Sequence, residues 1–164
     1  SQDQRHRMTP ASRPVLLAHL TEAPDVVRPP LVADDDAGRA LCDETMSAVW
    51  DALAALRRLG APAEALAYLL PNAAAVRFTE SADYSALRHK HAMRLCYNAQ
   101  EEIWRASLDE ALQVTAVHPR LGRYLEPPCS LRRRAERQPY CPEGRRYCGV
   151  PVWKEARESF RRLL

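Results

Sequence analysis

The helical character of this protein is clearest in residues 36–71, which read DAGRALCDETMSAVWDALAALRRLGAPAEALAYLLP. Apolar side chains recur in this stretch at the spacing of one helix face, with acidic residues near its start and basic residues before Gly60. Because glycine commonly follows the last turn of a helix, the pattern predicts a long helix over 36–59. Pro62 favours a helix start, so a second, shorter helix is expected over 63–70.

The stretches on either side predict an alternation of loops, short strands and further helices. Several prolines in residues 1–36 favour extended or looped chain, with a strand candidate at 15–20. A second strand candidate covers 74–79, where Arg77 points opposite to its apolar neighbours. Further helices are expected over 82–96, 98–117 and 154–164, with an irregular segment over 118–153 that is rich in proline, glycine, cysteine and arginine.

Composition is typical of a globular protein of one domain. The 164 residues and the 46% hydrophobic content are enough for a real core. No apolar run approaches the roughly 18 residues that a membrane span needs, and the first residues are polar, so we expect a cytoplasmic protein with no membrane partner. The net charge of +3 is mild and does not require a nucleic-acid partner.

Arginine is far more frequent than lysine, which occurs only at Lys90 and Lys154. The planar guanidinium suits phosphate better than an ammonium group does, although a GC-rich genome produces the same bias. The triplet Arg5-His6-Arg7 has two alternative interpretations. In an extended chain Arg5 and Arg7 project to one side as a phosphate clamp; otherwise the triplet is a solvated basic end.

A second group of basic side chains lies on the helix expected over 82–96. Arg88, His91 and Arg94 follow one another at spacings of three and can share a helix face, with His89 beside them. They form either a ligand-binding face or a charged solvent face. A metal pair from His89 and His91 is disfavoured, because side chains at alternate positions on a helix splay apart.

Three motifs, taken in order, resemble the flavin-dependent thymidylate synthases. They are Arg5-His6-Arg7; Gly60-Ala61-Pro62-Ala63-Glu64 followed by Leu70-Pro71; and Arg94 followed by Gln100-Glu101-Glu102-Ile103. The resemblance implies an α+β fold: a helix-rich domain with a small mixed sheet and an irregular cysteine-rich C-terminal segment. It also implies a divergent or partial member. Residues 1–125 would form the synthase-like domain, without the N-terminal part of the family domain, and residues 126–164 a Cys/Arg-rich extension with a terminal helix.

The same resemblance implies an enzyme that methylates a uridine nucleotide, dUMP or UMP, at C5. In this family reduced FAD relays a methylene group from methylenetetrahydrofolate, NADPH reduces the flavin, and the assembly is a homotetramer. By resemblance, Arg94 contacts the uracil ring and acts in catalysis, and Gln2 contacts the nucleotide. The residues that would bind FAD are Arg5, His6, Arg7 and His89.

Three positions depart from the family pattern. Val15 stands where the family has a serine, and Ala67 and Ser85 stand where it has arginines. An alternative to the active enzyme is therefore a catalytically inactive homologue that serves as a structural or nucleotide-binding module. Candidates to supply the missing phosphate contacts are Arg13, Arg88 and Arg77, the last of which we assign to the substrate site.

The C-terminal segment carries Cys129, Cys141 and Cys148 in turns rich in proline and glycine, with His118 upstream. Three thiolates and an imidazole predict a tetrahedral structural zinc site, which would order a segment that has no core of its own. Free thiols, a disulfide and an iron–sulfur cluster are the alternatives. A cytoplasmic compartment disfavours the disulfide.

Two weaker patterns remain. Cys42 and Cys96 fall inside expected helices and are predicted to pack as small hydrophobes. The arginine runs 132–134 and 145–146 predict a solvated loop, or a phosphate contact in a neighbouring subunit, rather than a nucleic-acid patch.

Overall fold

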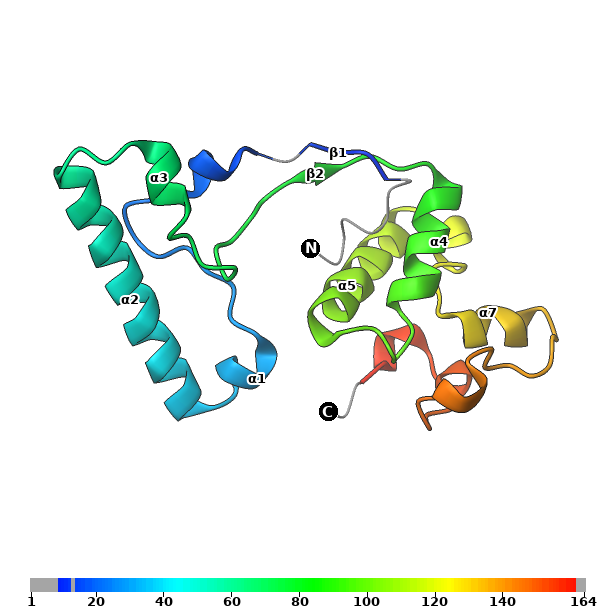
Figure 1. Cartoon of the computed structure of the whole chain (residues 1–164). Coiled ribbons are helices and arrows are strands. Elements are labelled where there is room, and N and C mark those ends of the chain that lie inside the picture. Colours follow the sequence, from blue (N-terminus) through cyan, green and yellow to red (C-terminus); the bar gives the residue numbers. More distant parts are fainter. Residues whose placement is uncertain (1–8, 13, 162–164) are drawn as a thin grey trace. The chain divides into compact units, whose positions relative to one another are not determined.

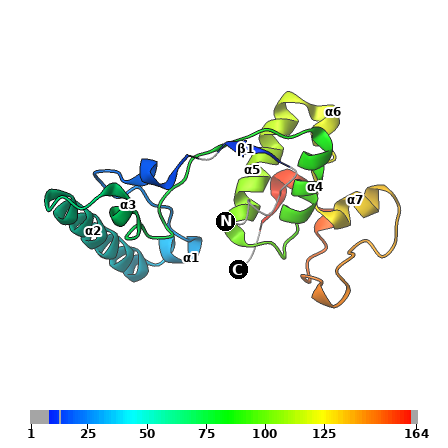
Figure 2. The same cartoon turned by 45° about the horizontal axis from the view of Figure 1, so that its top comes forward.

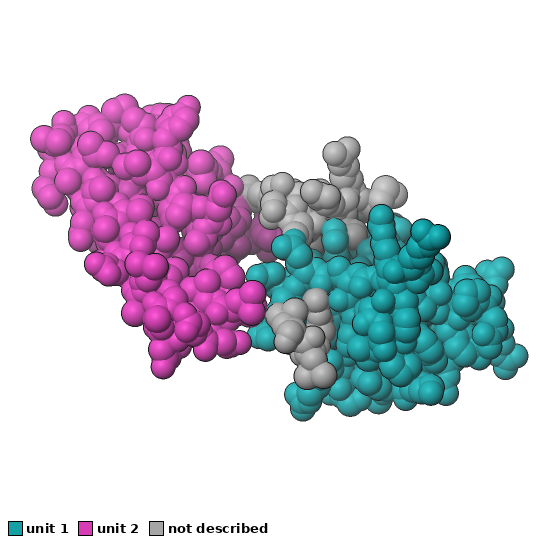
Figure 3. All heavy atoms as spheres, turned by 60° about the horizontal axis from the view of Figure 1, so that its bottom comes forward, with its two compact units in different colours: residues 1–10, 81–164 teal, residues 11–80 magenta. Residues whose placement is uncertain are grey.

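The structure is a computed structural model that describes residues 9–12 and 14–161 (Figure 1). The chain forms two compact units, residues 11–80 and residues 81–164 with 1–10 (Figure 3). This division follows packing within the chain. The predicted boundary at residue 125 concerns the family domain and its extension, and it stays a prediction.

The unit of residues 11–80 is built on the long helix that the sequence predicts. Helix α2 spans Asp36–Arg58, and the Asp35 side chain caps it by accepting a hydrogen bond of 2.6 Å from the Gly38 N–H. Gly60 follows with a φ of +80°, a conformation that glycine adopts without steric cost. Two short helices accompany it, α1 at Pro30–Ala33 and α3 at Ala63–Ala67.

One face of α2 makes the core of this unit. Trp50 and Leu53 pack with Leu66 of α3, and all three side chains are buried. The Trp50 Nε1–H donates a hydrogen bond of 3.1 Å to the Thr21 hydroxyl, which satisfies the polar atom of a largely buried indole. The helix expected over 63–70 is shorter than predicted, because α3 ends at Ala67 and single turn bonds continue the chain to Leu70.

Strand structure is scarce among the described residues. Strands β1 (Ala11–Ser12) and β2 (Thr79–Glu80) pair antiparallel, with Ala11 opposite Glu80. The small sheet is therefore two-stranded and antiparallel where the structure describes it, and not mixed as expected. The strand predicted over 15–20 is wrong, because Leu16–His19 is a turn of 3₁₀ helix. The strand predicted over 74–79 is reduced to an isolated bridge at Ala74 and to Thr79.

The unit that begins at Ser81 is helical and has two apolar clusters. Its helices are α4 (Tyr84–Arg94), α5 (Glu101–Val117), α6 (Pro119–Gly122) and α7 (Pro128–Arg134), of which α4 and α5 lie side by side in both ribbon views (Figures 1 and 2). One cluster joins Leu95, Ala111 and Leu125. The other joins Tyr97, Trp104, Val152 and Phe160.

The C-terminal part of the chain differs from the expectation in two ways. Residues 118–153, expected to be irregular, contain α6, α7 and short 3₁₀ turns. The helix expected over 154–164 is not found in its described part, up to residue 161, where Arg157–Ser159 is a single 3₁₀ turn. Tertiary contacts explain the difference. The buried Arg157 and Phe160 contact other elements, and these contacts rather than helical periodicity determine the conformation of the segment.

No helix among the described residues combines the length and apolar character that crossing a bilayer would require. The elements described above confirm the expected helix-rich fold, and the sheet is smaller than expected.

Candidate functional site

Helix α4 carries two of the predicted site residues, His89 and Arg94. The Asp83 carboxylate caps its start by accepting a hydrogen bond of 2.8 Å from the Ala86 N–H. His89 is exposed, and Arg94 is half-buried in the last turn. Five positions separate them, which places their side chains on different sides of the helix axis rather than one above the other. One helix therefore presents an imidazole and a guanidinium in different directions.

His91, predicted to share a face with Arg88 and Arg94, instead points into the core. Its side chain is fully buried, with Nδ1 2.8 Å from the Leu87 carbonyl oxygen and Nε2 3.5 Å from the Glu110 carboxylate. Burial lowers the pKa of His91, although the Leu87 carbonyl and the Glu110 carboxylate act in the opposite direction. The neutral ring therefore donates from Nδ1 to Leu87.

An ion pair between the buried Lys90 and the half-buried Glu110 ties α4 to α5 beside this histidine. The Lys90 Nζ lies 3.3 Å from the Glu110 carboxylate, and the Lys90 residue is only 5% exposed. Because removing one member of a buried ion pair leaves an uncompensated charge, this contact holds the two helices in one register. It orients α4, and with it His89 and Arg94.

The motif Gln100-Glu101-Glu102 begins α5. Gln100 is the N-cap residue, and the two glutamates occupy the first turn, where carboxylates suit the helix dipole. The turn from α4 is fixed by aromatic packing. The Tyr97 ring stands edge-on to the Trp104 ring at 5.6 Å, and the Trp104 Nε1–H donates to the Leu95 carbonyl at 3.2 Å. Arg94 at the end of α4 and Gln100 at the start of α5 are thus joined by a well-packed turn.

The remaining predicted residues lie elsewhere. Arg77 belongs to the other compact unit, where its Nη1 lies 2.5 Å from an Asp25 carboxylate oxygen. This hydrogen bond holds the pKa of Asp25 below its ordinary value. The pair is exposed, and water screens it. The predicted residues that fall outside the described part of the chain are Gln2, Arg5, His6, Arg7 and Arg13.

The structure also locates the departures from the family pattern. Ser85 is exposed in the first turn of α4, and Arg88 is exposed three residues later. Residues three apart on a helix are neighbours, so the Arg88 guanidinium can reach the space that an arginine at position 85 would fill. Ala67 ends α3 in the other unit, and Val15 is 71% exposed.

Three of the four predicted zinc ligands line one small pocket. Cys129, Cys141 and Cys148 are joined there by Cys96, which the sequence had placed inside a helix but which follows the end of α4. His118 does not line the pocket; it is exposed at the C-terminal end of α5. In the described residues no group of three or more His, Cys, Asp and Glu side chains stands ready to hold a metal ion.

The thiols of this pocket are unpaired. No disulfide joins the five cysteines, so the disulfide alternative is wrong for this structure. Burial raises the pKa of the Cys129 thiol to about 11, and the neighbouring Cys141 and Cys96 add to the effect. Burial likewise raises the pKa of Cys96. In this arrangement both thiols are neutral at neutral pH.

A second cavity was not predicted from the sequence. It has a volume of about 520 Å³, and Arg133, Arg134, Arg157 and Trp153 are among the residues that line it. The buried Arg157 donates to the carbonyls of Gly122 and Leu125 at 2.8 and 2.7 Å. The arginines 132–134 lie in α7 and not in a loop, and Arg133 and Arg134 are exposed. Arg132 donates to the Pro139 carbonyl, Arg133 to that of Trp153, and Arg134 to the Glu126 carboxylate.

Comparisons with known proteins define the class of protein to which this helical scaffold belongs. A family model described as thymidylate synthase complementing protein matches residues 1–120. The chain is 31% identical over 137 residues to the flavin-dependent thymidylate synthase of Geobacter sulfurreducens, an alignment that covers 84% of this chain and 55% of that protein.

A second relative is the flavin-dependent thymidylate synthase of Sulfurisphaera tokodaii, 36% identical over 72 residues, which are 44% of this chain and 28% of that protein. The chain therefore belongs to the thymidylate synthase complementing protein family, the family of the flavin-dependent thymidylate synthases. It spans 55% of the length of the Geobacter relative.

Proposed function

We propose that this protein methylates a uridine nucleotide, dUMP or UMP, at C5, with FAD, methylenetetrahydrofolate and NADPH as its cofactor and co-substrates. The observation that carries the proposal is the family match over residues 1–120, which contains the Arg5-His6-Arg7, Gly60–Pro71 and Arg94–Ile103 motifs in order. Family membership supports FAD as the cofactor. We infer a uridine nucleotide from the same resemblance.

The donors of α4 fit a flavin and a nucleotide. His89 is exposed and Arg94 is half-buried at the C-terminal end of the helix, so both side chains have an accessible part. An imidazole and a guanidinium are hydrogen-bond donors of the kind that ring carbonyls and phosphate oxygens accept from. FAD would supply the reducing electrons and carry the one-carbon group. With His89, the residues that would hold it are Arg5, His6 and Arg7.

Arg94 has the central role in this proposal. Partial burial of its guanidinium strengthens its electrostatic effect on a bound ring. A fixed cation at the uracil carbonyl stabilises the negative charge that develops when C5 becomes nucleophilic. The ion pair of Lys90 with Glu110 and the Tyr97–Trp104 contact hold the end of α4 in place, so Arg94 needs little reorganisation.

Gln2 and Arg77 stay the proposed contacts of the nucleotide beside Arg94, and Arg88 is a candidate to replace a missing phosphate contact. Arg88 stands one turn from Ser85 and replaces the arginine missing there. Arg77 would exchange its exposed Asp25 partner for phosphate, which costs little because water already screens that pair. We further propose a homotetramer in the cytoplasm, with each flavin site completed by neighbouring copies.

Arg94→Ala tests the assignment, with Arg120→Ala as the matched control, since Arg120 is an exposed arginine of α6 in the same unit. Removal of one charge-stabilising donor should lower kcat for dUMP methylation by about 100-fold or more, whereas the control should keep full activity. Equal activity of Arg94→Ala and wild type, at equal flavin content, would show that Arg94 has another role.

The departures at Val15, Ala67 and Ser85 favour a second candidate, a nucleotide-binding homologue without activity. The two candidates differ in flavin content. The enzyme should purify yellow, and FAD should raise its melting temperature. A colourless protein that is stabilised by dUMP but not by FAD would support the second candidate.

A further inference from the structure

Four arginines from three segments of the unit that begins at Ser81 line the cavity of about 520 Å³. Arg123 follows the end of α6, Arg133 and Arg134 lie in the last turn of α7, and Arg157 begins a 3₁₀ turn. Cavities that bind small molecules have volumes of roughly 300–1,000 Å³. None of the described residues that we assign to the flavin or the nucleotide belongs to this wall. The cavity is therefore a separate candidate binding site.

Arg157 is a buried cation in this wall without an anionic partner. The residue is only 6% exposed, and its guanidinium donates to the Gly122 and Leu125 carbonyls and to the Thr115 hydroxyl. These acceptors are neutral. Among the described residues no carboxylate lies within ion-pair distance of Arg157, and its buried Nε has no hydrogen-bond partner. Because a buried charge is costly without a counter-charge, an anion bound in the cavity would stabilise this arginine.

Close packing of two helices fixes the position of Arg157. A Cβ atom at Gly122 of α6 would lie 2.3 Å from the Thr115 Oγ1 of α5, so only glycine allows the two helices to approach this closely. The approach places the Gly122 carbonyl and the Thr115 hydroxyl within 2.8 and 2.7 Å of the same guanidinium. A cation that is held in place before a ligand arrives costs little to order when the ligand binds.

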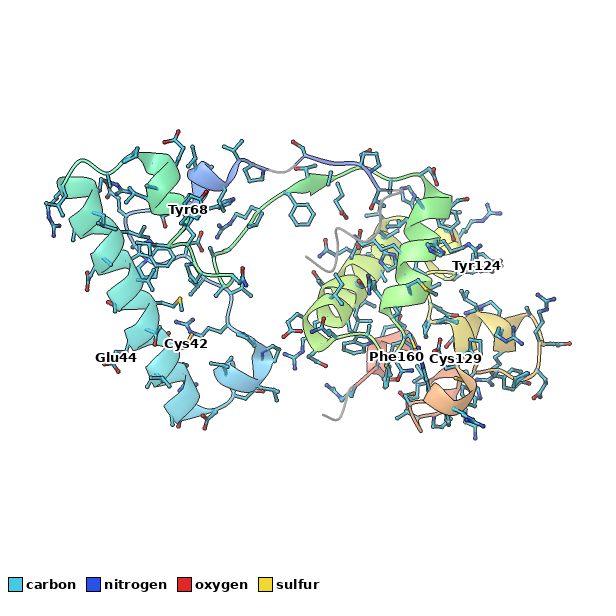
Figure 4. All side chains as sticks on the ribbon, in the orientation of Figure 1. Cys42, Glu44, Tyr68, Tyr124, Cys129 and Phe160 are labelled. Atoms are coloured by element: carbon cyan, nitrogen blue, oxygen red, sulfur yellow. The ribbon has the colours of Figure 1, made fainter. Side chains whose placement is uncertain are left out.

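One aromatic ring keeps two of the other guanidinium groups close together. The Cζ atom of Arg123 lies 4.6 Å from the centroid of the Tyr124 ring, and that of Arg134 lies 6.0 Å from the same centroid (Tyr124 is labelled in Figure 4). Arg123 also donates a hydrogen bond to the Tyr124 hydroxyl. An aromatic ring attracts cations, so Tyr124 holds two like charges near each other. Binding of an anion would reduce their mutual repulsion.

The exposed arginines have donors left for a ligand. A guanidinium carries five N–H donors, and Arg123 and Arg133 each use one of them in a side-chain hydrogen bond, to the Tyr124 hydroxyl and to the Trp153 carbonyl. Neither has a carboxylate partner among the described residues, whereas Arg134 pairs with Glu126 at 2.8 Å. Arg123 and Arg133 are therefore the arginines that suit a phosphate, which binds best to planar guanidinium groups.

Carboxylates in the same wall limit the kind of anion that fits. Glu155 and Glu158 are exposed there, and neither has an ion pair among the described residues. Two such charges repel a polyanion such as a nucleic acid. Ionised carboxylates accept hydrogen bonds, for which the hydroxyl groups of a ligand are suitable donors. The mixed wall therefore favours a small ligand with one phosphate group and several hydroxyls.

We propose that this cavity binds a phosphomonoester carried on a small polyhydroxylated molecule of the sugar phosphate class. Arg123 and Arg133 bind the phosphate oxygens, and Arg157 supplies a fixed positive charge beneath them. Glu155 and Glu158 accept hydrogen bonds from the hydroxyls of the carrier. The sequence left open a phosphate contact of the arginine run in a neighbouring subunit, and the proposed contact lies within one chain instead. It does not rest on the proposed flavin chemistry.

The test is a calorimetric titration of the full chain with ribose 5-phosphate, inorganic phosphate and ribose. Ribose 5-phosphate should bind at one molecule per chain, and inorganic phosphate should bind at least about fivefold more weakly because it lacks the hydroxyls. Ribose should show no saturable binding. The proposal is overturned if ribose 5-phosphate does not bind at concentrations up to about 10 mM. Equal affinity for inorganic phosphate would contradict the role of the two glutamates.

Matched variants locate the bound phosphate. Arg123→Gln and Arg133→Gln change exposed residues and should each weaken binding of ribose 5-phosphate at least about tenfold. The control Arg137→Gln changes an exposed arginine just after α7 that is not part of the wall, and it should bind as the wild type does.

Arg77→Gln distinguishes the cavity from the proposed nucleotide site. This variant should keep the affinity for ribose 5-phosphate. Loss of binding in Arg77→Gln, with full binding in Arg133→Gln, would place the phosphate at the nucleotide site and make the proposal wrong. Flavin content and dUMP binding, measured in parallel on the same variants, separate failure here from failure of the proposed enzyme.

Discussion

The two compact units of this protein use very different means to form a core. Residues 11–80 rely on one long helix, α2, whose Trp50 and Leu53 bury against Leu66 of α3. Residues 81–161 rely on aromatic packing, on the ion pair of the buried Lys90 with the half-buried Glu110, and on a buried arginine, Arg157. The second unit also contains both cavities described above. The comparison teaches that the buried charged side chains Lys90 and Arg157 and both of these cavities occur in one unit, while the core cluster of the other is apolar.

The first unit also leaves much apolar surface exposed. Tyr68 is 91% exposed and Leu59 82% exposed, although both lie next to elements with a regular helical pattern. The helix period therefore identifies which stretch is helical but not how much of its apolar surface this chain covers by itself.

The largest expected effect comes from removing the central tryptophan of each unit. Trp50→Ala and Trp104→Ala should each lower the free energy of unfolding of the unit concerned by about 3–5 kcal/mol, because each leaves a cavity in a packed cluster. Urea unfolding followed by far-ultraviolet circular dichroism reports the helices of both units, and in Trp50→Ala the fluorescence of Trp104 and Trp153 reports the second unit alone. If either variant shifts both units equally, the two units unfold as one and the comparison fails.

A smaller effect is expected for Arg157, which distinguishes polar from apolar burial. Arg157→Met keeps most of the side-chain volume but removes the donors to Gly122 and Leu125, and should destabilise the second unit by about 1–3 kcal/mol. The control Arg120→Met changes an exposed arginine of α6 and should stay within about 0.5 kcal/mol of wild type. No loss of stability in Arg157→Met would mean that water replaces the arginine at these carbonyls.

The smallest effect on stability at neutral pH is expected for His91, which should instead make the stability of the second unit depend on pH. Its folded pKa lies below the unfolded value of about 6.5, so between these two values the unfolded state binds more protons. The second unit should therefore lose stability as the pH falls below about 6.5 and should show no contribution from His91 above it. The groups that face this ring are the Leu87 carbonyl, Glu110, Lys90 and Arg157.

Thermal unfolding from pH 5 to pH 8 measures this dependence, and His91→Gln should flatten it. The stability of residues 11–80 should not show the pH dependence caused by His91, since this histidine belongs to the other unit. A slope that survives His91→Gln unchanged would assign the pH dependence to another group.

Local signals in the sequence located most helices but few strands. Helix α2 was predicted within a residue of its end, because its cap, periodicity and terminal glycine all lie within the helix or next to it. The candidates at 15–20 and 74–79 were mostly not strands, because a strand needs a partner and the chain offers little pairing there. The family itself was recognised from short motifs, since the spacing of such motifs survives where their tertiary contacts are unknown.

The candidate site was predictable only in part. His89 is exposed and Arg94 is half-buried on α4, and their roles stay predictions. His91 is buried, and nothing in its spacing from Arg88 distinguishes it. Cys96 was assigned to a helix interior. A helix that ends two residues earlier turns it toward Cys129 and Cys141 instead. The signal that would have found it is the loop-like sequence Tyr97-Asn98-Ala99 that follows.

The amino-acid sequence alone determined the long helix α2, the helices α4 and α5 and membership of the family, because these depend on residues a few positions apart. Only the tertiary structure decided that His91 and Arg157 are buried, that residues 157–159 form a 3₁₀ turn, and that four distant cysteines share one pocket. Those features depend on packing between segments far apart in the chain, and no local pattern encodes which distant side chain will lie opposite.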